Sequence, residues 1–232
     1  MRRKQRLARR WTAALALLTS TSASAATIDL FGSGSRFTVP VRSFSELRFH
    51  GVVRQQYDFS CGSAALATLL SSHYGRPTTE QTVFRAMYEA GDQRRIRMQG
   101  FSLLDMKRYV ERLGYQANGY KVSLHDIEKT KIPGIALITL QGYRHFVVVK
   151  GVSESRVLLG DPARGLRAIS REEFQSGWNG VLFAIHSGPR LLPDGFNRPR
   201  EWALFPEVPV EEAAARASLA NFTLSLPRPS DF

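Results

Sequence analysis

The spacing of the apolar residues changes midway along the chain, and this change constrains the fold more than any other feature of the sequence. From Cys61, apolar residues recur at intervals of three to five, which is typical of the buried side of a helix. Gly75 is placed to end this helix as its C′ residue. Two further helices are expected over about residues 79–90 and from Ser102 to Gly114, the last one opening with a Ser-x-x-Asp capping spacing.

The second half of the chain contains apolar runs of strand length. They cover residues 135–140, 145–152, 156–161, 168–170 and 181–185. A short polar turn, Ser153-Glu154-Ser155, joins the second run to the third and predicts an antiparallel hairpin. Helices first and an antiparallel sheet afterwards predict an α+β fold, with N-terminal helices packed on a C-terminal antiparallel sheet.

The first 25 residues have the pattern of a secretory signal peptide. A basic start is followed by a short apolar run over residues 11–18 and by Ala23-Ser24-Ala25, which reads as an A-x-A cleavage signal. We therefore expect cleavage near Ala25 and a periplasmic or secreted protein. An uncleaved anchor or a disordered basic arm is the alternative, although the apolar run is too short to span a bilayer.

The rest of the chain divides into three parts by composition. Residues 26–49 contain short strand-like pieces and are expected to form edge strands or an extended arm. Residues 50–186 are expected to form the main folded domain, and residues 187–232 are expected to form a Pro-rich tail that wraps the domain or contacts a partner. No segment after Ala26 has the length and apolar character of a membrane-spanning helix, so no integral membrane domain is expected.

The basic charge of the chain is concentrated at its start. The formal net charge is +12, but residues 1–25 hold six basic and no acidic residues, so +6 remains without them. No basic stripe interleaved with aromatic residues is present, and nucleic-acid binding is therefore not expected. No Cys/His cluster has the spacing of zinc ligands, and we expect neither a metal nor another cofactor.

The chain contains a single cysteine, Cys61. In an oxidising compartment a lone thiol is buried, used in catalysis or paired with another molecule, and the sequence leaves these three open. Its place at the start of the first expected helix favours catalysis, because the helix dipole stabilises a thiolate. Gln55 lies six residues earlier and can bring its amide next to the Cys61 N–H as a second oxyanion donor, with Gln56 as the alternative.

The histidine best placed to act as a base is His145, which opens an apolar strand. His73 lies on the same helix as the thiol but about 18 Å along it at the helical rise. If the following hairpin turns at Glu154, Val147 faces Asp161, and His145 lies on the same face within hydrogen-bonding reach of that carboxylate. A slip of one residue would separate the two. Taken alone, each residue is also compatible with a strand-edge histidine or an ordinary Asp-Pro turn.

Three segments resemble the motifs of a known family. Residues 55–66 (QQYDFSCGSAAL) resemble the nucleophile motif of the bacteriocin-processing, double-glycine cysteine peptidases. Residues 143–148 (YRHFVV) resemble their histidine motif, and residues 160–165 (GDPARG) resemble their aspartate motif, in the same chain order. The resemblance covers about residues 50–185.

The resemblance implies a papain-like fold and a Cys-His-Asp triad. Cys61, His145 and Asp161 take the roles of nucleophile, base and orienting carboxylate, and Gln55 takes that of the oxyanion-hole side chain. Many members of the family carry aspartate before the cysteine, whereas this chain has Ser60. The sequence lacks the exporter and ATPase domains to which many members are fused, and it is similar to the free-standing exported form associated with functional-amyloid (Fap-type) secretion systems.

Together with the expected signal peptide, the resemblance implies an exported cysteine endopeptidase that cleaves after small residues, typically Gly-Gly, in a secreted or fibre-forming protein. Expected partners are that substrate and components of a secretion or amyloid export system. The alternatives are a non-catalytic peptide-binding module of the same system and, third, acyl transfer to an amine by the same triad. Alkylation of Cys61 against pH separates catalysis from binding, since an activated thiolate reacts well below the free-thiol pKa of about 8.5.

Overall fold

The computed structural model describes residues 26–32, 35–41, 43–140, 142–189 and 195–206. The expected signal peptide and most of the expected tail lie outside these residues. The chain forms two compact units that divide between Ser43 and Phe44. In the first unit, the strand-like pieces pair with each other as an antiparallel hairpin of β1 (Ala26–Gly32) and β2 (Ser35–Val41).

The second unit begins with helices. They are α1 (Phe44–Arg48), α2 (Cys61–His73), α3 (Glu80–Ala90), α4 (Gln93–Gln99) and α5 (Leu103–Arg112). The three expected helices are present as α2, α3 and α5, and α5 opens with the expected capping box between Ser102 and Asp105. Gly75 follows the C-cap of α2 with a φ of 57°, as a C′ glycine does. The short helix α4, capped by Asp92, was not expected.

The sheet of the second unit has six antiparallel strands. They are β3 (Gln116–Lys121), β4 (Gly134–Leu140), β5 (Tyr143–Val152), β6 (Arg156–Asp161), β7 (Gly165–Ser170) and β8 (Trp178–Ser187), in the order β3-β8-β4-β5-β6-β7. All five strands expected in this half are present, and the α+β class is confirmed. The mostly exposed edge strand β3 was missed, because its polar sequence QANGYK lacks a strand's apolar alternation.

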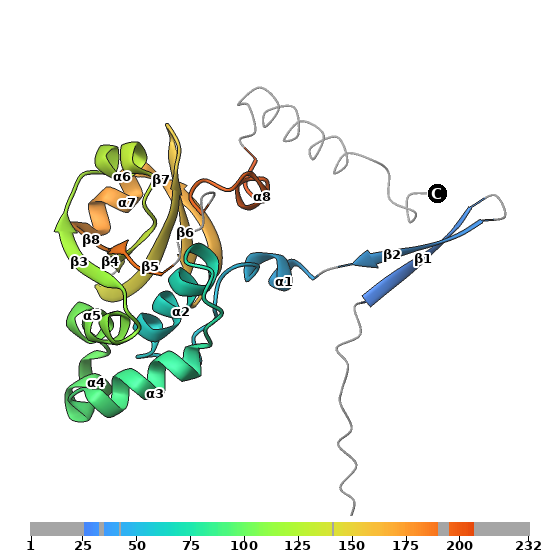
Figure 1. The fold of residues 1–232 in the computed structure, drawn as a ribbon. Helices are drawn as coiled ribbons and strands as arrows, with labels where there is room; N and C mark the ends of the chain where they lie inside the picture. The colour runs from blue at the N-terminus through green and yellow to red at the C-terminus, as the bar shows by residue number, and fades with distance from the viewer. Residues whose placement is uncertain (1–25, 33–34, 42, 141, 190–194, 207–232) are drawn as a thin grey trace, which may run out of the picture. The chain divides into compact units, whose positions relative to one another are not determined.

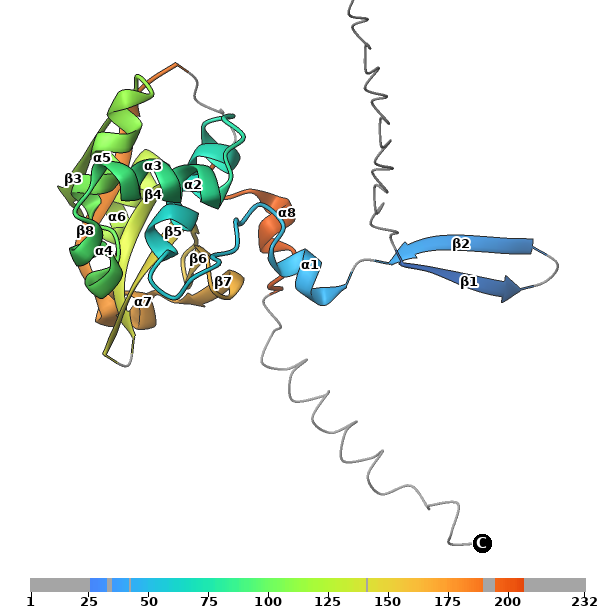
Figure 2. The ribbon, with the colours of Figure 1, turned by 90° about the horizontal axis from the view of Figure 1, so that it is seen from below.

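Helices cover both faces of this sheet (Figures 1 and 2). Helices α2, α3 and α5 form one core with alternate residues of the strands, such as Val148 of β5. Helices α6 (Leu124–Thr130) and α7 (Arg171–Gly177) form the other core with the residues between them, such as Val147 and Val149. Because side chains of a strand alternate between faces, one apolar run serves both cores.

The segment 195–206 packs against the sheet as part of the second unit. It contains the short helix α8 (Pro199–Trp202). Trp202, Leu204 and Phe205 pack around the buried residues Leu158 and Leu166 of β6 and β7. The described part of the C-terminal region therefore adds a small third core beside the two that flank the sheet.

Candidate active site

Cys61 is the first residue of α2 and is buried, with 7% of its surface exposed. Ser60 occupies the N-cap position, but its side chain does not cap the helix. Its hydroxyl instead donates to the carbonyl of Tyr57 at 2.9 Å and accepts from the Tyr57 N–H at 3.1 Å. This closed turn sets the direction in which the chain enters α2. The first N–H groups of the helix lack intrahelical partners, so they leave donors and a positive dipole end beside the thiol.

His145 and Asp161 are joined by a buried hydrogen bond. His145 Nε2 lies 2.8 Å from Asp161 Oδ1, and the residues are 6% and 1% exposed. The hairpin pairs Val148 with Gly160 and Val149 with Leu159, which is the register expected at this end of the strands. The juxtaposition inferred from the hairpin is therefore present in the structure.

The Asp161 carboxylate is fixed by further donors. Its Oδ1 accepts backbone N–H bonds from Ala163 at 2.9 Å and Arg164 at 3.1 Å. Burial by itself would raise the pKa of Asp161, but the bond to His145 and these backbone donors outweigh burial and lower it. The carboxylate therefore stays ionised and oriented over the physiological range.

The same contacts act in the opposite direction on the imidazole. Burial by itself lowers the pKa of His145, but the hydrogen bond to Asp161 and the nearby Cys61 outweigh burial and raise that pKa to about 9. Because Nε2 bonds to Asp161, Nδ1 is the ring nitrogen that remains available. It is buried and has no hydrogen-bond partner among the described residues. Cys61 lies near enough to the ring to raise the pKa of His145, although its thiol makes no hydrogen bond to Nδ1 in the structure.

Gln55 and Gln56 differ in what holds them. The Gln55 N–H donates to the carbonyl of Pro162 at 3.0 Å, so Gln55 lies beside the residue that follows Asp161. Its side-chain Nε2 donates to Tyr57 O at 3.1 Å, while its Oε1 is buried with no partner among the described residues. The exposed side chain of Gln56 instead bonds to Gln81 of α3. These contacts favour Gln55 as the glutamine that serves the thiol.

Cys61 opens onto a cleft of about 750 Å³. Aromatic side chains line it together with apolar and basic ones: Phe59, Phe101, Tyr143, Phe146, Met98, Leu103, Leu137, Val181, Arg95, Arg97 and Arg144. A cleft of this size is large enough for several residues of an extended peptide. In the part of the chain that the structure describes, no cluster of residues could hold a metal ion, and no helix is long and apolar enough to cross a membrane.

Residues 50–190 match the peptidase C39 family. The chain belongs to this family. A protein of Pseudomonas aeruginosa named probable functional amyloid protease FapD is 44% identical over 173 residues, which are 74% of this chain and 76% of the relative. The protein of the same name from Pseudomonas fluorescens is 42% identical over 158 residues, 68% of this chain and 70% of the relative. The C39 peptidase is thus a cysteine peptidase of the double-glycine type, as the three motifs implied.

Other relatives are larger proteins. The Lactococcus lactis protein named lactococcin-G-processing and transport ATP-binding protein LagD is 34% identical over 134 residues, 56% of this chain and 18% of the relative. The peptidase domain of Streptococcus ComA, a bi-functional ABC transporter, matches the C39 peptidase with a TM-score of 0.50 and 22% identity, over 60% of this chain and 98% of that domain. This structural likeness supports the papain-like fold.

Two residues beside the site were missed in the sequence. The Tyr143 hydroxyl donates to the carbonyl of Asp58 at 2.9 Å, and its ring lies 6.0 Å from the His145 ring. Arg167 Nη1 lies 3.5 Å from Asp161 Oδ2. The signal for Tyr143 was its place two residues before His145 on one strand, whereas Arg167 depends on the pairing of β6 with β7.

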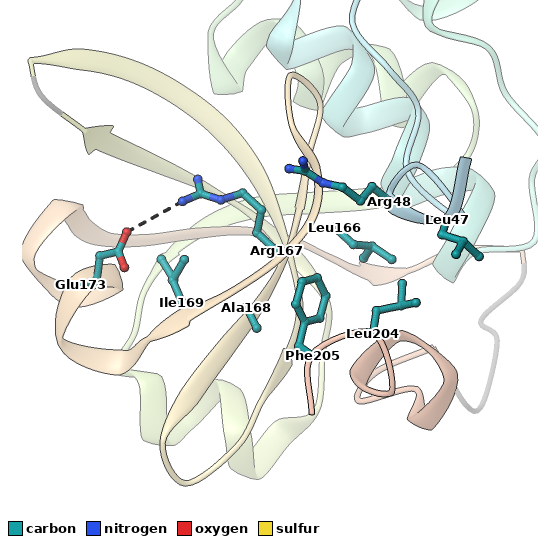
Figure 3. A pocket seen from close by; sticks show the side chains of 9 residues that line it. All are labelled: Leu47, Arg48, Leu166, Arg167, Ala168, Ile169, Glu173, Leu204 and Phe205. Carbon is teal, nitrogen blue, oxygen red and sulfur yellow. Dashed lines mark ion pairs between the residues drawn. The ribbon is translucent and has the colours of Figure 1, made fainter. Parts of the chain in front are cut away.

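Arg167 also lines a second cavity, of about 450 Å³ (Figure 3). In the figure its side chain reaches toward Glu173, and the Phe205 ring lies on the other side of the cavity, near Leu204. None of Cys61, His145 and Asp161 lines this cavity. Of these three residues, Cys61 lines the larger cleft.

Proposed function

We propose that this C39 peptidase is an exported endopeptidase that cleaves after small residues, of the Gly-Gly type, in a secreted or fibre-forming protein. Cys61 acts as nucleophile, His145 as base and Asp161 as the orienting carboxylate. The observation that carries the proposal is the buried 2.8 Å bond between His145 and Asp161, which leaves Nδ1 for the thiol at the start of α2. The name of the FapD relatives supports a substrate in a functional-amyloid system.

The chemistry follows from these positions. His145 Nδ1 takes the proton of the Cys61 thiol, and the thiolate sulfur adds to the carbonyl carbon of the scissile peptide bond. The resulting oxyanion accepts hydrogen bonds from the Cys61 N–H and from the amide of Gln55. Collapse breaks the C–N bond as the imidazolium gives its proton to the leaving amine. Water, deprotonated by His145, then adds to the thioester carbonyl, and the acid product leaves as the sulfur returns to the thiol.

A preference for small residues at the cleaved bond is supported by the lining of the cleft. Phe59, Tyr143 and Phe146 line it together with Cys61. Their rings limit the side-chain volume that fits in the cleft, while a glycine pair brings its backbone close to the sulfur. Export is supported by the first 25 residues alone. Sequencing the N-terminus of the protein purified from cells tests it, and a start other than near Ala26 would contradict cleavage at Ala25.

The function is tested with purified protein and a peptide carrying one Gly-Gly bond. We expect cleavage after the second glycine by the wild type and none by Cys61→Ala, with both proteins melting at similar temperatures. Replacing the glycine pair by Leu-Leu is the matched substrate control and should abolish cleavage. Cleavage by Cys61→Ala would contradict the thiol mechanism, and equal cleavage of both peptides would contradict the proposed specificity. Comparing proteins secreted by wild-type and Cys61→Ala cells by mass spectrometry then identifies the substrate.

A further inference from the structure

Lys150 is a fully buried charged residue in the middle of the sheet. It lies on β5 at a bulge, since the pairing with β6 passes from Val149 directly to Gly151. Its Nζ lies 2.8 Å from Glu201 Oε1 and donates to the carbonyl of Gly51 at 2.9 Å. A buried lysine is costly unless it is paired, and here a single carboxylate and a single carbonyl meet that need.

The partner carboxylate comes from a segment outside the C39 match, which ends at residue 190. Glu201 belongs to α8 and is 4% exposed. Asn197 of the same segment bonds to β5 with both backbone and side chain: its N–H donates to Lys150 O at 2.9 Å, and its amide exchanges hydrogen bonds of 2.8 and 3.0 Å with Val152. The segment is thus hydrogen-bonded to β5 at the bulge.

The other partner of Lys150 begins the loop that leads to the thiol. Gly51 O also accepts from Ser72 Oγ of α2 at 2.8 Å. Two residues later the Val53 N–H donates to Thr68 Oγ1 of α2 at 2.8 Å. Gln55, the expected oxyanion donor, follows, with its N–H on the Pro162 carbonyl at 3.0 Å. These contacts fix the path from the buried ammonium to the oxyanion side chain.

The space around Gly51 shows how closely the loop meets the ion pair. Gly51 has a φ of 70°, in the left-handed region. A Cβ added there would lie 3.2 Å from Glu201 Oε1 and 3.4 Å from Lys150 Nζ. The charged groups therefore stand against the loop backbone itself, and a shift of either one moves the place where the loop begins.

We propose that Lys150 and Glu201 are positioning residues, which hold the 51–55 loop so that Gln55 stands at the oxyanion hole. The C-terminal segment then supplies part of the catalytic geometry, although it lies outside the matched family region. This inference rests on the proposed function, because Gln55 matters only if Cys61 attacks a carbonyl. A buried ion pair can often be replaced by two apolar residues without loss of stability. Such a replacement should therefore change the position of the 51–55 loop and leave the stability of the protein nearly unchanged.

The test is the double variant Lys150→Met/Glu201→Leu, in which no buried charge is left unpaired. We expect its melting temperature to stay close to that of the wild type and its kcat on the Gly-Gly peptide to fall about tenfold or more, with little change in KM. Alkylation of Cys61 by iodoacetamide needs no oxyanion hole and should be unchanged. The pair Lys107 and Glu111 of α5, whose side chains are 34% and 46% exposed, is changed to Met and Leu as the matched control with wild-type kcat.

Hydrogen exchange separates this inference from the proposed function. The Val53 and Gln55 amides, both hydrogen-bonded, should exchange faster in the double variant than in the wild type or the control. If the wild type does not cleave the peptide, the proposed function fails, and exchange alone decides the role of the pair. Wild-type kcat in the double variant, or unchanged exchange at both amides, overturns the inference. If the double variant does not fold, Glu201→Gln is measured in the same way, with the same outcomes.

Discussion

Asp161 Oδ1 accepts three hydrogen bonds at once: from His145 Nε2 and from the N–H groups of Ala163 and Arg164. The same oxygen therefore both orients the imidazole and is held by the turn that follows β6. Asp161 Oδ2 faces Arg167 Nη1 at 3.5 Å. The two oxygens have separate contacts. Variants can therefore distinguish the loss of the Asp161 charge from the loss of the hydrogen bond that orients the His145 ring.

Asp161→Asn and Asp161→Ala are expected to differ in activity. Asparagine keeps an oxygen that can accept from His145 and from the backbone donors, whereas alanine removes the acceptor. We expect kcat/KM to fall about 10²-fold or more in Asp161→Ala and less in Asp161→Asn. Cleavage of the Gly-Gly peptide measures both. Equal losses in the two variants would show that the charge, and not the orientation, is what the reaction needs.

The His145–Asp161 pair predicts a specific dependence of stability on pH. The pKa of His145 is raised from 6.5 to about 9, so its contribution is fully present below about pH 6.5 and is lost as pH rises through about 9. The pKa of Asp161 is lowered from 3.8, so its contribution is lost as pH falls below that value. The melting temperatures of wild type and Asp161→Asn should differ most near pH 5–6, and the difference should shrink as pH rises through about 9.

The control for that profile is Asp126, an exposed carboxylate in the capping box of α6. Its pKa is lowered first by hydrogen bonds from Ser123 and to a smaller extent by the charges of His125 and Lys129, and no hydrogen bond to a histidine is involved. The difference in melting temperature between wild type and Asp126→Asn should stay constant from about pH 8 to pH 10, the range in which the contribution of His145 is lost. If the difference in melting temperature between wild type and Asp161→Asn is equally constant over this range, the buried pair does not titrate as the structure implies.

The alkylation rate of Cys61 tests its coupling to His145. The imidazolium and the start of α2 both place positive charge beside the sulfur, which favours the nucleophilic thiolate. Iodoacetamide should therefore alkylate Cys61 faster at pH 6 in the wild type than in His145→Ala. Mass spectrometry measures the alkylation rate of Cys61 against pH in both proteins. Identical rates in wild type and His145→Ala would exclude activation of the thiol by His145.

Gly51→Ala and Gly114→Ala form a matched pair for stability. Both glycines have left-handed φ values, 70° and 84°, so alanine strains each by about 1–2 kcal/mol. Only at Gly51 would the added Cβ meet the Lys150–Glu201 pair, since nothing lies within 4 Å of a Cβ at Gly114. Urea unfolding should therefore show a larger loss for Gly51→Ala. Equal losses would mean that the ion pair yields easily to the new methyl group.

Tyr143→Phe tests the bond between the start of β5 and the loop before Cys61. The ring stays and only the hydroxyl that donates to Asp58 O is removed, so we expect a stability loss of about 0.5–1 kcal/mol and cleavage slowed a few-fold. Tyr120→Phe removes a comparable hydroxyl, bonded to His186, from a tyrosine that does not line the cleft. The control should cleave at the wild-type rate, and a Tyr143→Phe variant that does the same would contradict a role for this bond.

Local patterns in the sequence were enough to predict much of the fold and the main pair of the site. The helix that begins at Leu103 carries its own capping box, and the helix that begins at Cys61 is followed by a C′ glycine, Gly75. The hairpin around Glu154 has a period of two that places His145 near Asp161. Such features depend on neighbours along the chain, so they can be inferred without coordinates. Helix α4 and strand β3 were missed because both are short and mostly polar, and tertiary contacts stabilise them.

Only the tertiary structure decided which distant residues meet. In the sequence Lys150 is a lysine that interrupts an apolar strand, and nothing near it indicates that Glu201 and the carbonyl of Gly51 surround its ammonium. Likewise, the sequence leaves Gln56 as an alternative to Gln55, whereas the structure shows Gln55 held by the carbonyl of Pro162 and Gln56 bonded to Gln81. A repeating pattern determines how each element forms and which side it buries. The register and packing of separate elements depend on the sum of many long-range contacts, which no local pattern contains.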